Sequence, residues 1–142
     1  LQSHHALPAR TVLENALLFS HLDRDASADS MEMAKTSLDR LGLRQLSDKR
    51  ARQLSGGELQ RVAVARALTS SRRLILADEP TSNLDRRSAA VVMSLLADVA
   101  SMTVERSALI VTHDYQALPE GVRTLELTGS GLVDADASLR LR

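Results

Sequence analysis

An apolar run that ends in two carboxylates is the feature that most restricts how this chain can fold. Leu74 to Ala77 are all apolar, and Asp78, Glu79 and Pro80 follow at once. A run this short, bounded by charge and proline, is typical of a buried strand in a parallel sheet. Ligands of such sheets bind outside the carboxyl ends of the strands. The sequence therefore predicts an α/β fold with both carboxylates at the binding edge of a parallel sheet.

A second short apolar run, Ala108 to Val111, predicts another buried strand, and His113 comes just after it. If the two strands run parallel, His113 lies at the same edge as Asp78 and Glu79. An aspartate there can hold Mg²⁺, usually through water. A glutamate beside it can accept a proton from an attacking water. The plainer alternatives are a solvated acidic turn and a structural histidine.

Between residues 55 and 58 the chain combines a hydroxyl, two glycines and a carboxylate. Ser55 and Glu58 have the spacing of a capping box, which predicts a helix from there to about Leu68. The unpaired N–H groups of a helix N-terminus suit a phosphate, and Gly56 and Gly57 would let it approach the backbone closely. Taken alone, these four residues fit an ordinary capped helix equally well.

The remaining pattern divides the chain into a helical part and a part that alternates strand and helix. We expect a helical subdomain over residues 1–70 and an α/β part over residues 71–142 of the same domain. The other expected elements are a helix over 12–22 opened by a Thr11–Glu14 capping box, a loop over 24–30, a helix ending before Gly42, a helix capped by Asp85, a strand over 122–127 and a hairpin turn over 128–131.

Composition excludes several classes of function. The formal net charge of +0 argues against a protein that binds nucleic acid by neutralising phosphates. Phe19 and Tyr115 are too few to form a platform on which bases stack. The absence of cysteine rules out disulfides and thiolate metal sites. No apolar run approaches the roughly 20 residues of a membrane-spanning helix.

Two longer strings carry a resemblance to a known family. Residues 54–68, LSGGELQRVAVARAL, resemble the signature motif of the nucleotide-binding domains of ABC transporters, and residues 77–85, ADEPTSNLD, resemble their Walker B motif and D-loop. His113 then resembles the switch histidine, and Gln2 resembles the glutamine of the Q-loop. These motifs follow the order of the family. The strings look most like those of the lipoprotein-releasing and macrolide-export branch.

The resemblance implies a partial P-loop NTPase core, with a parallel sheet and a helical signature subdomain, that binds and hydrolyses ATP to drive transport. It implies that Glu79 and His113 are catalytic and act on ATP held by their own subunit. Asp78 and Gln2 would bind the nucleotide and reach Mg²⁺ indirectly. ATP and Mg²⁺ are therefore the expected substrate and cofactor.

The resemblance also implies partners, since these domains pair head to tail with ATP between them. Ser55, Gly56 and Gly57 would bind the γ-phosphate of ATP held mainly by a second nucleotide-binding domain. Asp85 would link the two sites across the dimer. A transmembrane permease subunit would hold the protein at the inner, cytoplasmic face of the cell membrane, and no nucleic acid is expected as a partner.

The sequence departs from the family in one respect. Lys35 and Lys49 are its only lysines and neither follows a glycine, so a P-loop of the form G-x-x-x-x-G-K-[ST] is absent. We therefore expect a C-terminal portion of such a domain. Because phosphoryl transfer depends mostly on positioning and charge, the 142-residue chain alone should neither bind ATP tightly nor hydrolyse it. An uncovered apolar sheet edge would also favour instability or association.

Two other functions stay open. The chain could be a non-catalytic module that lends its signature motif to ATP on another subunit, although Glu79 and His113 would then serve no purpose. It could instead belong to a soluble ABC ATPase of DNA repair or translation, although the zinc-binding cysteines of some repair proteins are absent.

Overall fold

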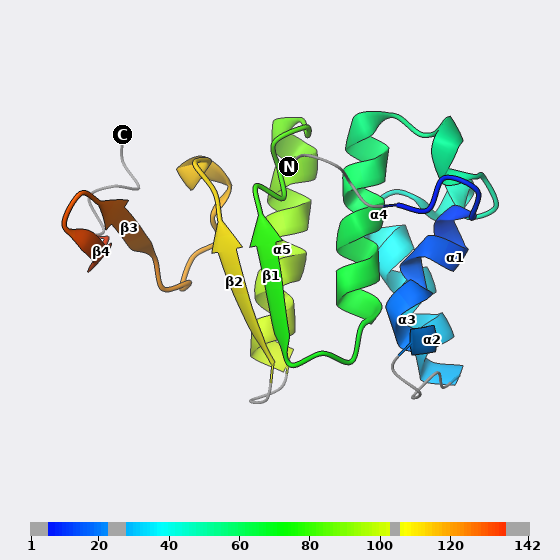
Figure 1. Cartoon of the computed structure of the whole chain (residues 1–142), viewed down its shortest axis with the longest axis horizontal. Helices are drawn as coiled ribbons and strands as arrows, with labels where there is room; N and C mark the ends of the chain where they lie inside the picture. The colour runs from blue at the N-terminus through cyan, green and yellow to red at the C-terminus, as the bar shows by residue number, and fades with distance from the viewer. Residues whose placement is uncertain (1–5, 23–27, 103–105, 136–142) are drawn as a thin grey trace.

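The computed structural model describes residues 6–22, 28–102 and 106–135, and it places a helical part beside a small parallel sheet (Figure 1). The α-helices and strands are α1 (Val12–Ala16), α2 (Leu18–Leu22), α3 (Ala28–Arg40), α4 (Gly56–Thr69), β1 (Leu74–Asp78), α5 (Arg86–Met102), β2 (Ser107–Val111), β3 (Leu125–Thr128) and β4 (Gly131–Asp134). Within these ranges, short 3₁₀ helices cover Arg44–Leu46, Ala51–Gln53 and Tyr115–Ala117.

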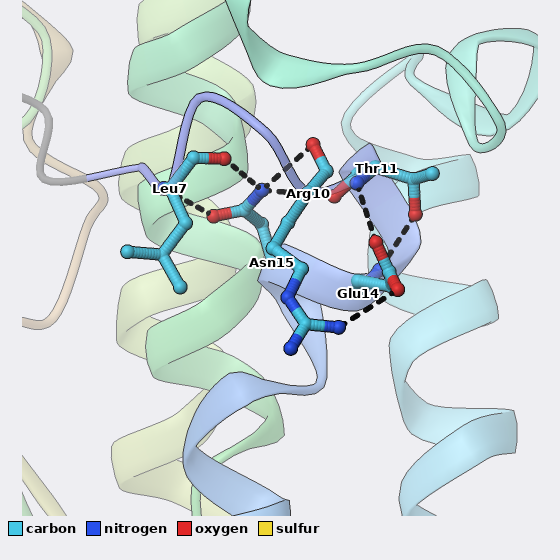
Figure 2. Close-up of polar contacts among 5 residues, drawn as sticks. All are labelled: Leu7, Arg10, Thr11, Glu14 and Asn15. Carbon is cyan, nitrogen blue, oxygen red and sulfur yellow. Dashed lines mark hydrogen bonds and ion pairs between the residues drawn. The ribbon is translucent and has the colours of Figure 1, made fainter.

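The predicted capping box at the start of α1 is confirmed. The Glu14 N–H donates to Thr11 Oγ1 at 3.1 Å, and the Thr11 N–H donates to Glu14 Oε2 at 2.8 Å (Figure 2). The prediction of one helix over 12–22 is wrong, because Leu17 divides it into α1 and α2. Ser20 Oγ donates to the Leu17 carbonyl at 2.8 Å, and the His21 N–H donates to the same carbonyl at 3.2 Å. Serine bonds of this kind to the backbone often bend a helix.

A buried asparagine fixes the turn that precedes α1. Asn15 is fully buried, and its Oδ1 accepts from the Leu7 N–H at 2.7 Å. Its Nδ2 donates to the Leu7 carbonyl at 3.1 Å and to the Thr11 carbonyl at 2.9 Å (Figure 2). Because a buried amide is costly unless it is hydrogen-bonded, this network ties the turn firmly to the helix.

Helix α3 ends as the sequence predicts and begins earlier. Gly42 has a φ of +67° and donates its N–H to the Asp39 carbonyl, and the Leu43 N–H bonds to Leu38, which forms a glycine-terminated helix end. The helix starts at Ala28, so the predicted loop over 24–30 is wrong in its last three residues. Asp29 in the first turn favours this earlier start through the helix dipole. Residues 23–27 lie outside the described residues.

The parallel sheet confirms the α/β fold class. Strands β1 and β2 pair in parallel, with Asp78 opposite Val111 at their carboxyl ends. Helix α5 lies against one face of this sheet (Figure 1). Ile75 is buried in the hydrophobic core, to which α5 also contributes. The side chains of Ala77, Ala108 and Ile110 are partly buried and pack against this core.

The prediction of two buried strands holds for one face of the sheet and is wrong for the other. Their other face exposes its apolar side chains, with Leu76 at 70% and Leu109 at 57% exposure; Leu74 and Val111 lie on the same face. The reason is that, in the described part of the chain, α5 covers only one side of the sheet. Period-2 alternation decides which side chains are left uncovered.

The last described elements form an antiparallel hairpin. Leu125 pairs with Asp134 and Thr128 with Gly131, so the hairpin turn predicted over 128–131 is confirmed. The strand predicted over 122–127 begins later, at Leu125, and pairs with β4 in place of the parallel sheet.

Candidate functional site

The carboxyl edge of the parallel sheet brings Glu79 and His113 together. Their strands end side by side, and each residue comes just after its strand. The His113 N–H donates to Glu79 Oε1 at 3.1 Å, and His113 Nδ1 lies 2.8 Å from the same oxygen. The Glu79 hydrogen bond and charge raise the pKa of His113, and the charge of Asp114 adds to this. In this pair the Glu79 carboxylate is partly buried, whereas the His113 side chain is 81% exposed.

Glu79 itself is held in an unusual backbone conformation. Its φ is +47°, in the left-handed region that residues other than glycine rarely adopt. Its N–H donates to the Val111 carbonyl at 2.8 Å, and its own carbonyl accepts from Gln60 Nε2 at 2.8 Å. Glu79 Oε2 is buried without a hydrogen-bond partner among the described residues. That oxygen therefore has an unused acceptor position.

A cleft of about 540 Å³ opens beside this pair. Its other lining residues come from the loop after β1 and the loop after β2: Thr81, Ser82, Leu84, Asp114, Tyr115 and Gln116. The Asp78 side chain is exposed at the end of β1. Within the described ranges, no group of three or more histidine, aspartate or glutamate side chains is arranged to hold a metal ion.

The predicted capping box at the start of α4 is confirmed. The Glu58 N–H donates to Ser55 Oγ at 3.3 Å, and Glu58 Oε2 accepts from the Ser55 N–H at 2.8 Å. These bonds lower the pKa of Glu58, with the Ser55 backbone as the largest cause. Ser55 and Gly56 are exposed, so the start of the helix faces outward.

Gly57 is needed for close packing against the loop after β1. A Cβ at this position would lie 2.9 Å from the Asn83 carbonyl oxygen and 3.4 Å from Leu84 Cδ2. The start of α4 therefore rests directly on the loop that contains Asn83.

The predicted helix cap at Asp85 is also confirmed. Asp85 Oδ1 accepts from the Ser88 N–H at 3.0 Å, and Asp85 Oδ2 accepts from the Ser88 hydroxyl at 2.6 Å. These bonds lower the pKa of Asp85. Arg61 Nη1 on α4 donates to Ser88 Oγ at 3.1 Å. Thus α4 also reaches the first turn of α5.

Comparison with known proteins identifies the family. The family model described as ABC transporter matches residues 1–82. The chain belongs to the ABC transporter family. A solved structure of an ABC transporter described as metal-chelate type, in an inward-facing conformation, is 28% identical with a TM-score of 0.72 and matches 99% of this chain. The dimeric bacterial ABC transporter cassette MJ0796 is 32% identical over 82% of this chain, with a TM-score of 0.69.

The matched region is only part of each of those protein chains. This chain spans 59% of the metal-chelate type transporter chain and 52% of the MJ0796 chain. A second structure of MJ0796, a dimeric post-hydrolysis state bound to ADP and Pi, matches with a TM-score of 0.68. No helix within the described ranges has both the length and the apolar character needed to cross a membrane.

In this ABC domain, the sequence patterns did not identify Gln60 and Asn83 as residues that support the site. Gln60 is buried, and its Oε1 accepts from Asn83 Nδ2 at 3.0 Å. The available signal was a glutamine four residues before the buried Val64 of α4, since polar residues on a buried helix face need partners. Gln2, the predicted Q-loop residue, lies outside the described residues.

Proposed function

We propose that this chain supplies the signature helix and the hydrolytic residues of an ATPase domain that drives an ABC transporter. The observation that carries the proposal is the Glu79–His113 pair, which leaves one buried carboxylate oxygen without a partner at the ligand-binding edge of the sheet. Residues 1–70 would act as the helical signature subdomain and residues 71–142 as the C-terminal part of the α/β core.

Each residue of the site would have a distinct task. The Glu79 carboxylate would accept the proton of the attacking water, and the exposed ring of His113 would contact the γ-phosphate. Asp78 and Gln2 would reach Mg²⁺ through water, and exposed oxygen ligands such as the Asp78 carboxylate fit this hard cation. When bound, Mg²⁺ neutralises phosphate charge.

The start of α4 would serve a second subunit. Ser55, Gly56 and Gly57 would contact the γ-phosphate of ATP held by a second nucleotide-binding domain, and Asp85 would link the two sites. The outward-facing start of α4 and the dimeric structures of MJ0796 support this arrangement. A transmembrane permease would then hold the protein at the cytoplasmic face of the membrane.

The missing lysine motif limits what these 142 residues do alone. A P-loop cradles the phosphates with backbone N–H groups and a lysine. We therefore propose that ATP binding by this domain requires a P-loop from sequence outside these 142 residues, and that the chain alone is inactive.

The test is a titration with Mg²⁺-ATP in which calorimetry measures the binding. The chain alone should show no micromolar binding, whereas the chain joined behind the P-loop half of an ABC cassette should bind. Micromolar binding by the chain alone would contradict the proposed need for a P-loop. Binding without hydrolysis by the joined protein would favour the non-catalytic module.

A further inference from the structure

The second turn of α4 contacts the loop that carries Glu79 from inside the protein. Gln60 is 7% exposed, and its amide makes two hydrogen bonds to that loop. Nε2 donates to the Glu79 carbonyl at 2.8 Å, and Oε1 accepts from Asn83 Nδ2 at 3.0 Å. One side chain of the signature helix therefore bridges the candidate proton acceptor and the D-loop.

This bridge acts where the backbone is strained. A residue other than glycine in the left-handed region costs roughly 1–3 kcal/mol and persists only when its surroundings hold it. Glu79 is held by β2 through its N–H and by His113 through its carboxylate. Its carbonyl accepts from Gln60 Nε2 at 2.8 Å and from the Ser82 N–H at 3.3 Å. Of these partners, Gln60 is the one that lies on α4, and its bond to the Glu79 carbonyl is shorter than that of Ser82.

We infer that Gln60 is a positioning residue that holds Glu79 in its left-handed conformation, so that the signature helix keeps the Glu79 carboxylate paired with His113. The catalytic meaning of this pairing rests on the proposed function, whereas the positioning does not. Neighbouring contacts strengthen the same junction, since Gly57 rests on Asn83 and Arg61 reaches Ser88.

The position of Gln60 gives the inference a consequence for the dimer. Helix α4 begins with the residues proposed to contact ATP on a second subunit, and one turn later it fixes the backbone of Glu79. A shift of α4 on meeting that nucleotide would therefore reach Glu79 within the same chain through one side chain.

The test measures the pKa of His113 by NMR in the 142-residue chain without nucleotide. Leucine in Gln60→Leu has a similar size but cannot donate to the Glu79 carbonyl. In the folded variant the pKa of His113 should fall toward its ordinary value of about 6.5. The matched control, Gln45→Leu, removes an exposed glutamine and should leave the pKa raised.

The outcomes separate positioning from general stabilisation. A glutamine that only stabilises the fold would lower the unfolding free energy in Gln60→Leu and leave the His113 pKa raised, which would overturn the inference. If Gln60→Leu does not fold, hydrogen exchange in the wild-type chain tests the inference. A side-chain amide proton of Gln60 should then exchange with water more slowly than those of Gln45, and equal rates would overturn the inference. Since no nucleotide is used, an inactive ATPase would leave either result standing.

Discussion

At the scale of single residues, the chemistry of the candidate site centres on the Glu79–His113 pair and on one strained backbone position. Glu79 adopts a conformation that few glutamates adopt, and hydrogen bonds from α4, from β2 with the residues that follow it, and from Ser82 hold it there. Backbone strain of this kind gathers at functional sites, where surrounding contacts over-determine the geometry. Because Glu79 raises the pKa of His113, the pairing should be measurable as a pH dependence of stability.

Replacing Glu79 by glutamine should make stability less dependent on pH. The pKa of His113 is raised in the folded state, so the pair stabilises the fold fully below about pH 6.5 and loses this contribution as the pH rises through the raised value. The difference in unfolding free energy between wild type and Glu79→Gln, measured in urea, should shrink over that window. A difference of constant size across the window would contradict the pairing.

Gly57→Ala should destabilise the chain, because the new methyl group would meet the fixed Asn83 carbonyl at 2.9 Å. Overpacking of this kind costs about 1–3 kcal/mol, and the better helix propensity of alanine offsets about 0.5–1 kcal/mol of it. Gly129→Ala is the matched control, since nothing lies within 4 Å of its Cβ position. Equal unfolding midpoints for the two variants would show that the loop yields freely.

Single residues also show where reading the sequence stops. Glu79 and His113 could be placed together because two short apolar runs fix the ends of two parallel strands. Gln60 could not be assigned, since its partners lie 19 and 23 positions away and depend on how α4 packs. The positive φ of Glu79 has no local signal, because glutamate does not favour it.

At the scale of elements, helix starts marked by a capping residue were the most predictable features. Capping boxes involve residues three apart, so the caps at Thr11 and Ser55 could be read directly. The division at Leu17 and the early start of α3 were not foreseen. Asp29 in the first turn favours the early start of α3, which depends on the helix dipole and not on a capping pattern.

The two capping boxes offer a matched pair of variants. Thr11→Ala and Ser55→Ala should each lower the unfolding free energy by about 1 kcal/mol, because each removes one acceptor for a helix N-terminal N–H. Chemical denaturation measures both. In the protein joined to a P-loop half, only Ser55→Ala should also weaken ATP-driven dimer formation. An equal loss in Thr11→Ala would assign the effect to stability alone.

At the scale of the whole molecule, the parallel sheet has one covered and one open face. The sequence predicts buried strands because their residues are apolar, and it carries no information on which face a helix covers. In the described part of the chain α5 covers the face that contains Ile75. The association expected of the open face stays a prediction.

Alanine substitutions at two neighbouring positions on β1 should differ strongly in their effect on the unfolding free energy. Ile75 is 5% exposed and Leu76 is 70% exposed. Ile75→Ala should cost about 2–5 kcal/mol of unfolding free energy through lost burial and a cavity. Leu76→Ala should change it by about 0.5 kcal/mol or less. Comparable losses in both variants would mean that the open face is covered in solution.

The most direct test of the account is the rate of phosphate release from ATP by this chain joined behind a P-loop half, in wild type and Glu79→Gln. We expect the variant still to bind Mg²⁺-ATP but to release phosphate about 10²–10⁴-fold more slowly, because a general base is lost. A variant that hydrolyses ATP within a few-fold of wild type, with the same binding, would contradict the assignment of Glu79 as the hydrolytic carboxylate.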